Sequence, residues 1–157
     1  KALAEVVGYA NANDAYHQTA SSPEGYGATL AIQQALAMSG LNPTQIDYIN
    51  MHGTGTPNND LSESFATKAV FGNQVPKFSS TKAFTGHTLA AAASIEAVIS
   101  VLSLQNSMIF PNLNFTTAIA ETGLIPETTL VNTPLNTILS NSFGFGGNCS
   151  SLIFKKA

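Results

Sequence analysis

Two histidines in this sequence stand beside glycines, and each follows a short apolar stretch. Residues 52–57 read HGTGTP, and residues 82–87 read KAFTGH, so His52 begins the first segment and His87 ends the second. Glycine allows a backbone to come close to a ligand. Two neutral imidazoles that converge on one oxygen can donate two hydrogen bonds to a developing enolate. His52 and His87 are therefore candidates for a catalytic pair.

Two other interpretations of the histidines exist, a hydrogen-bonded core histidine and a zinc site. Zinc sites built on a helix use a spacing such as His-Glu-x-x-His, and the sequence does not contain it. We predict no metal site.

Lys82 belongs to the same segment as His87, and we predict a catalytic role for it. A buried ammonium needs a partner because desolvation disfavours its charge. Glu96 is the best candidate partner in the sequence. We predict a Lys82–Glu96 ion pair that fixes the His87 loop, against the alternative of a surface lysine without a role.

A third glycine-rich segment, NSFGFGG at residues 141–147, completes a pattern. In this order, the three segments resemble the second half of a β-ketoacyl-acyl-carrier-protein synthase, a condensing enzyme of the thiolase superfamily. The likeness runs from residue 14 to residue 156. The nucleophilic cysteine of that family lies in the first half of the enzyme, so we interpret residues 1–157 as a C-terminal domain without its N-terminal half.

The resemblance implies a decarboxylative Claisen condensation in the synthesis of fatty acids, polyketides or polyenes. Family members carry a similar lysine and glutamate near positions 82 and 96. Threonines at the positions of Thr54 and Thr56 contact the pantetheine arm there, although these hydroxyls can also bond their own backbone. Asp60 matches part of an acidic pair that supports the following helix, since negative charge suits a helix N-terminus.

Glu63 is the second member of that acidic pair, and we expect it to brace the same helix. In the glycine turn, Phe145 matches the family position that gates the acyl pocket. Phe143 suits either substrate contact or core packing. Backbone amides of this turn, including that of Gly146, are candidates for an oxyanion hole.

Cys149, the only cysteine, follows the glycine turn and enters an apolar strand. We expect a buried hydrophobic residue there and not a nucleophile. The sequence also departs from the family pattern. It has Asn148 and Cys149 where Thr-Asn is usual, and Ala90 and Ser94 where glycine is usual. These changes indicate a divergent subfamily.

The composition indicates a surface that is partly covered in the working protein. Charged residues make up 10% of the chain, against roughly 25% in typical soluble domains, and arginine is absent. The net charge of −3 argues against a nucleic-acid partner. A single cysteine fits the reducing cytoplasm. The longest apolar stretch, residues 89–104, reads as too short and too polar to span a membrane, and no secretory signal is visible.

Strand and helix patterns alternate along the chain and end in two strands joined by the glycine turn. This order predicts one α/β domain, and the resemblance implies a thiolase-like half, a five-stranded mixed sheet flanked by helices. Residues 112–132 read as a long excursion. The expected strands are 2–9, 46–51, 77–80, 137–142 and 149–155, and the expected helices are 27–38, 58–71 and 88–104.

The resemblance implies an acyl carrier protein and the N-terminal half as partners, with a homodimer or heterodimer when full length. No cofactor is expected, because the substrates are carried on phosphopantetheine. The chain alone should be inactive. Two alternatives are a non-catalytic partner subunit of the chain-length-factor type and a thiolase-type acyltransferase that does not decarboxylate.

Overall fold

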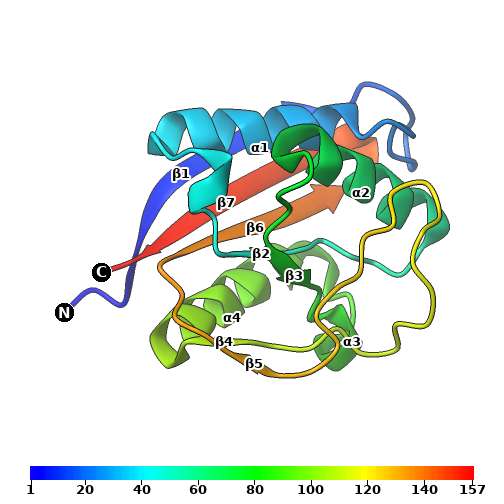
Figure 1. Ribbon diagram of the computed structural model, residues 1–157. Coiled ribbons are helices and arrows are strands. Elements are labelled where there is room, and N and C mark those ends of the chain that lie inside the picture. Colours follow the sequence, from blue (N-terminus) through cyan, green and yellow to red (C-terminus); the bar gives the residue numbers. More distant parts are fainter.

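A five-stranded mixed sheet in the order β1-β7-β6-β2-β3 forms the middle layer of the domain (Figure 1). The computed structural model describes all residues, 1–157. β2 runs parallel to β3 and β6, whereas β7 is antiparallel to both β1 and β6. The predicted fold class is confirmed. The strands are β1 Ala4–Asn13, β2 Tyr48–Asn50, β3 Lys77–Ser79, β6 Thr137–Gly144 and β7 Asn148–Lys156, and a separate pair is β4 Met108–Ile109 with β5 Val131–Asn132.

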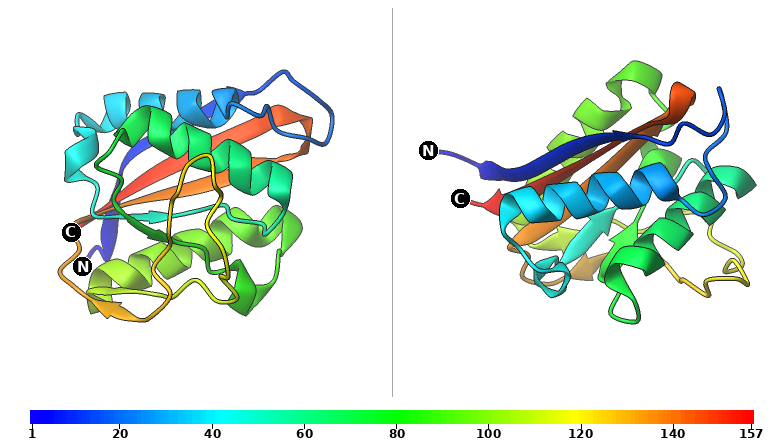
Figure 2. Two further views of the ribbon diagram at one scale, coloured as in Figure 1. Left: turned by 45° about the vertical axis from the view of Figure 1, so that its right-hand side comes forward. Right: turned by 90° about the horizontal axis from the view of Figure 1, so that it is seen from above.

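Helices cover both faces of the sheet, as Figure 2 shows from above. α1 (Tyr26–Ser39) and α2 (Pro57–Phe71) lie together on one face, and α4 (Ala92–Asn106) lies on the other. A one-turn helix, α3 (Lys82–Thr85), was not predicted. The remaining short turns are the 3-10 helices Pro43–Gln45, Leu89–Ala91 and Phe145–Gly147.

The strand residues alternate between two hydrophobic cores, as the side-chain period of two requires. Ile49 and Leu139 belong to the core under α1 and α2, whereas Tyr48 and Ile138 belong to the core under α4. All four are fully buried. This alternation fixes the register of β2 against β6, and so fixes what lies at their ends.

The first strand is longer than the sequence predicts. β1 continues to Asn13 because Asn11 and Asn13 pair with Ser150 and Asn148 of β7. Asparagine disfavours strands, so the polar composition concealed this part of the strand. β1 and β7 also bring the two chain termini side by side (Figure 1).

The long apolar helix α4 is covered only on its sheet-facing side, where Glu96, Ser100 and Leu104 are buried. Residues 89–106 do have the length and composition of a membrane-spanning helix, so the expectation that the stretch is too short and too polar was wrong. Its packing against β6 and β7, with a buried glutamate on that side, is that of a helix covering a sheet.

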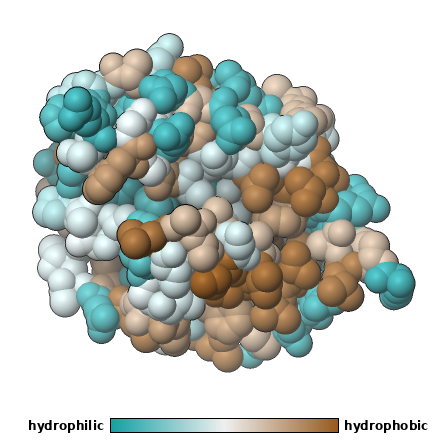
Figure 3. All heavy atoms as spheres, turned by 180° about the vertical axis from the view of Figure 1, so that it is seen from behind, coloured by the Kyte–Doolittle hydropathy of each residue, from teal (hydrophilic) through white to brown (hydrophobic).

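An open apolar face lies beside this helix. Val98 and Leu102 of α4 are exposed, as are Val6 and Tyr9 of β1. Val6 and Tyr9 pair with Phe154 and Leu152, which pack with the core under α4, so all four exposed residues lie on the same side of the sheet. Figure 3 looks onto this side and shows apolar side chains gathered there. We call Val6, Tyr9, Val98 and Leu102 the open face.

Candidate active site

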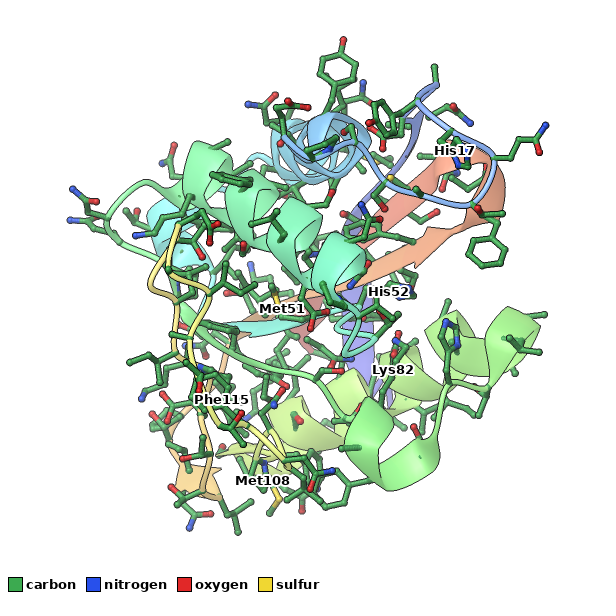
Figure 4. All side chains as sticks on the ribbon, turned by 90° about the vertical axis from the view of Figure 1, so that its right-hand side faces the viewer. His17, Met51, His52, Lys82, Met108 and Phe115 are labelled. Atoms are coloured by element: carbon green, nitrogen blue, oxygen red, sulfur yellow. The ribbon has the colours of Figure 1, made fainter.

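The candidate catalytic residues gather where parallel strands end. β2 ends at Asn50, two residues before His52, and β3 ends at Ser79, three residues before Lys82. The carboxyl ends of parallel strands meet at one edge of a sheet, where ligands of such folds bind. Figure 4 shows His52 and Lys82 close together at this edge.

The two predicted histidines come together. Their ring centroids lie 5.4 Å apart, and the rings are nearly perpendicular, at 86°. His52 is 4% exposed, whereas His87 is open to solvent. The ring of Phe143 lies 5.5 Å from that of His52, on a side chain that is half buried.

Hydrogen bonds define which ring nitrogen carries the proton in each histidine. Nζ of Lys82 lies 3.3 Å from Nδ1 of His52, and an ammonium has only donors. The backbone N–H of Leu89 donates to Nδ1 of His87 at 3.2 Å. Each Nδ1 is therefore an acceptor, and the proton of each neutral ring lies on Nε2. Both rings then present one N–H donor.

The electrostatic environment keeps His52 uncharged. Burial, followed by the positive charge of Lys82, lowers the pKa of His52 to about 3. An imidazole with this pKa is neutral throughout the physiological range. His52 is thus suited to donate a hydrogen bond, and not to act as a fixed positive charge.

The predicted ion pair is confirmed. Lys82 and Glu96 are both buried and bonded to each other, and Ser142 Oγ lies 3.4 Å from the second carboxylate oxygen of Glu96. Burial raises the pKa of Glu96, and the hydrogen bond from Lys82 opposes this effect. Lys82 thereby bridges α4 and the His52 ring.

Glu63 does not brace the start of α2, and this prediction was wrong. It lies in the second turn of the helix, and its carboxylate accepts the backbone N–H groups of His52 and Gly53, each at 2.9 Å. Asn141 Nδ2 donates to it at 3.2 Å. Burial raises the pKa of Glu63 to about 7. The residue holds the His52 segment in place.

Asp60 does lie in the first turn of α2, as predicted, and accepts from the backbone N–H of Gly55 at 3.3 Å. The hydroxyls of Thr54 and Thr56 lie 2.9 Å apart. Thr56 is the N-cap of α2, where its hydroxyl accepts from the backbone N–H of Asn59. The two threonines therefore have local partners in this structure.

The glycine turn lies at the same edge of the sheet, between β6 and β7. Phe145 is 76% exposed at its tip, in contrast to the half-buried Phe143. Gly146 has a φ of 78° and donates its N–H to the carbonyl of Gln18. This amide is therefore already bonded and is not free to serve an oxyanion hole.

A cavity of about 610 Å³ adjoins the site. Glu63, Lys82 and His87 contribute to its lining, as do several residues of the long excursion, among them Asn112 and Phe115. Outside this region, Cys149 is buried in the core under α1, and burial raises the pKa of its thiol to about 12. This environment suits a structural residue, as expected. No three His, Cys, Asp or Glu side chains are placed to hold one metal ion.

Sequence reasoning missed several supporting residues. Asn141 joins Glu63 to the hydroxyl of Ser151, and Ser142 joins Glu96, both from the end of β6. Polar residues within an otherwise apolar strand were the available signal. Their partners come from α2 and α4, more than forty residues away in the sequence.

Comparison with known proteins identifies the family of the chain. Residues 3–116 match the family model of the β-ketoacyl synthase C-terminal domain.

The chain belongs to this ketosynthase family.

The ketosynthase domain is 46% identical to 3-oxoacyl-(acyl-carrier-protein) synthase 1 of Haemophilus influenzae, over 99% of the domain and 38% of the relative. It is 43% identical to 3-oxoacyl-(acyl-carrier-protein) synthase 2 of Staphylococcus aureus, over 98% of the domain and again 38% of the relative. The domain therefore spans well under half the length of these relatives.

Solved structures show the same fold. A ketosynthase bound to its type II polyketide acyl-carrier protein matches with a TM-score of 0.94 and 34% identity, over 99% of the domain and 39% of that chain. A ketosynthase in complex with its chain length factor from Xenorhabdus doucetiae matches with a TM-score of 0.84 and 38% identity, over 100% and 40%.

Proposed function

We propose that this domain is the C-terminal half of a 3-oxoacyl-acyl-carrier-protein synthase that performs a decarboxylative Claisen condensation. One observation carries the proposal. His52 and His87 lie edge to face, and each has its Nδ1 occupied by a donor, so both rings offer an Nε2–H group. The relatives named above are synthases of this type.

The difficult step in the reaction is the formation of the enolate, in which negative charge develops on the malonyl thioester oxygen. When carbon dioxide leaves, the electron pair of the broken carbon–carbon bond moves toward this oxygen to form an enolate. The enolate carbon then attacks an acyl thioester, whose cysteine sulfur leaves. Two N–H donors directed at the enolate oxygen stabilise it, and removing one such donor typically costs ~10²–10³ in rate.

Lys82 has a supporting role in this scheme. Its ammonium holds Nδ1 of His52 as an acceptor, and its charge lowers the pKa of His52. Glu96 compensates the ammonium in the buried site. The pair therefore keeps His52 neutral and correctly protonated.

We assign the substrate arm to the edge that carries Thr54, Thr56 and the glycine turn. The hydroxyls of the two threonines, bonded to each other in the free domain, are available to a phosphopantetheine amide. Phe145, exposed at the turn beside Phe143 and Gly146, is our candidate for the wall of the acyl site. The substrates bring their own phosphopantetheine, so the scheme requires no resident cofactor.

The open face is our candidate for the contact with the N-terminal half. Val6, Tyr9, Val98 and Leu102 form an apolar surface that a monomeric domain seldom leaves uncovered. The relatives are about two and a half times as long, so they contain a segment of sufficient size to cover it. The nucleophilic cysteine belongs to that segment, so the isolated domain should be inactive.

Further partners follow from the same scheme. We propose an acyl carrier protein as the donor of both substrates, a dimer as the full-length state and the cytoplasm as the location. Solved relatives include complexes with an acyl-carrier protein and with a chain length factor. The second of these supports an alternative, in which the domain belongs to a chain-length-factor-like partner subunit.

The test is an assay of the full-length protein with malonyl-carrier and acyl-carrier thioesters. We expect carbon dioxide release and a 3-oxoacyl product, together with a cysteine at the nucleophile position of the N-terminal half. Another residue at that position, with no product from the protein alone and product only with an added synthase, would favour the partner-subunit alternative.

A further inference from the structure

The loop between β1 and α1, residues 14–25, lies over the edge of the sheet that carries the histidines. Figure 4 shows His17 of this loop at the β6–β7 end, on the same side of the molecule as His52. Residues 15–19 are all exposed, so no hydrophobic contact buries this part of the loop. Its position therefore depends on polar contacts at a few points.

The first contact closes the base of the loop. The carboxylate of Asp14 accepts the backbone N–H of Ser22, its hydroxyl at 2.7 Å and the N–H of Gly27 at 2.9 Å. Asp14 and Ser22 are both buried. This contact holds the two ends of the loop together but does not fix the position of its outer part.

The second contact joins the loop to the glycine turn. The N–H of Asp14 donates to the carbonyl of Gly147 at 2.8 Å, and the N–H of Gly146 donates to the carbonyl of Gln18 at 2.7 Å. Asn13 Nδ2 donates to the carbonyl of Gly146 at 2.8 Å. Gly147 has a φ of 78°, which favours glycine, and a Cβ there would lie 2.9 Å from Oδ1 of Asn13.

The third contact joins the loop to the start of α2. Asn58 Oδ1 accepts the backbone N–H of Ser21 at 3.0 Å, and Asn58 Nδ2 donates to the backbone carbonyl of Ser21 at 3.2 Å. One side-chain amide thus satisfies both backbone groups of a single residue 37 positions away. Asn58 lies in the first turn of α2, two residues after Thr56.

We propose that Asn58 is a positioning residue that fixes the loop against the start of α2 and so shapes the passage to the histidines. The loop is held on one side by the glycine turn and on the other by Asn58, and His52 follows β2 at the same edge of the sheet. Without Asn58, residues 15–21 are held from one side only. This inference rests on the proposed function for what travels along the passage, namely a thioester on a phosphopantetheine arm.

Three variants of the full-length protein separate the contact from general effects. Asn58→Ala removes both hydrogen bonds. Asn58→Asp keeps the acceptor and loses the donor. Ser21→Ala is the matched control, because Asn58 contacts only the backbone of Ser21.

Amide hydrogen exchange is the first measurement. We expect Asn58→Ala to raise exchange in residues 16–21 about tenfold, the size expected when exposed hydrogen bonds hold a loop closed. Asn58→Asp should give a smaller increase, and Ser21→Ala should match the wild type. Exchange in α4 should stay unchanged in all three, which excludes general unfolding. Unchanged exchange at residues 16–21 in Asn58→Ala overturns the proposal.

Steady-state kinetics is the second measurement. A loop that Asn58 no longer holds should impair substrate binding more than it slows the chemical step. Asn58→Ala should therefore raise KM for the malonyl-carrier thioester about fivefold and change kcat less than twofold. Equal KM values overturn the positioning role. If the wild-type protein shows no condensation while Asn58→Ala still loosens the loop, then the proposed function fails and the structural contact stands.

Discussion

Nζ of Lys82 lies 3.3 Å from Nδ1 of His52 while the same ammonium pairs with Glu96. Burial and this cation together lower the pKa of the histidine, and the cation determines which ring nitrogen carries the proton. The two residues therefore have different roles. Lys82 keeps Nδ1 of His52 an acceptor, and the His52 ring supplies the Nε2–H donor.

The histidine pair gives the most direct prediction. In the full-length protein, His52→Ala and His87→Ala should each lower malonyl decarboxylation by ~10²–10³, because each removes one donor to the enolate oxygen. Release of labelled carbon dioxide measures this step apart from acyl transfer. Loss of less than fivefold in both variants, with folding preserved by circular dichroism, would remove the pair from the mechanism.

Lys82→Met should destabilise the fold, and Lys77→Met provides the matched control. Removing Lys82 leaves the Glu96 carboxylate buried without its partner, which typically costs about 3–5 kcal/mol. The Lys77–Glu127 pair is much more exposed, with 47% of the lysine side chain accessible, and such pairs contribute about 0–1 kcal/mol. Urea unfolding of both variants checks the difference. Similar losses would contradict the structure.

Glu63 should give the stability a specific pH dependence. Its folded pKa, about 7, lies above the ordinary value of 4.5, so the folded state retains a proton that the unfolded state loses between these values. Its contribution to stability is therefore full below pH 4.5 and is lost as pH rises through 7, by up to about 3 kcal/mol.

Comparison with Glu63→Gln isolates this contribution, because opposing groups such as His52 are present in both proteins. The stability of the wild type relative to Glu63→Gln should fall between pH 4.5 and 7.5 in urea titrations. A difference that is constant across this range would show that Glu63 does not change its protonation there.

The open face predicts a surface mutation with a large effect. Val98 is 60% exposed in the domain. If the N-terminal half covers it as proposed, Val98→Asp should lower the stability of the full-length protein by about 2 kcal/mol or more, because a charge would enter that apolar contact. Ile125→Asp is the control, since Ile125 is 67% exposed on the long excursion and belongs to no core. If thermal unfolding shows equal small shifts for both, then the open face is not where the N-terminal half binds.

Much of the site could be predicted because its signals are local in sequence. Glycines beside His52 and His87 indicated close approach, and Lys82 needed a charged partner that Glu96 supplies. The strand pair around the glycine turn also follows from local periodicity. The meeting of His52 and His87, which are distant in sequence, was implied by the resemblance to condensing enzymes.

The failures share a different cause, namely partners that are distant in sequence. Glu63 fits the pattern of a helix-start residue, yet its position in the second turn directs it to the His52 backbone. Asn58 fits the pattern of an ordinary residue at a helix start, and only the structure shows that Ser21 lies against it. The apolar composition of α4 does not show which side is covered, because Val98 and Leu102 are exposed whereas Glu96 and Ser100 are buried.

The neighbouring ends of β1 and β7 have a practical consequence. Ala4 pairs with Lys156, whereas the histidines lie beyond the opposite ends of the strands, where β2, β3 and β6 finish. An affinity tag or surface tether attached at residue 157 would therefore project away from the histidines. Immobilised assays can use this attachment point without obstructing the site.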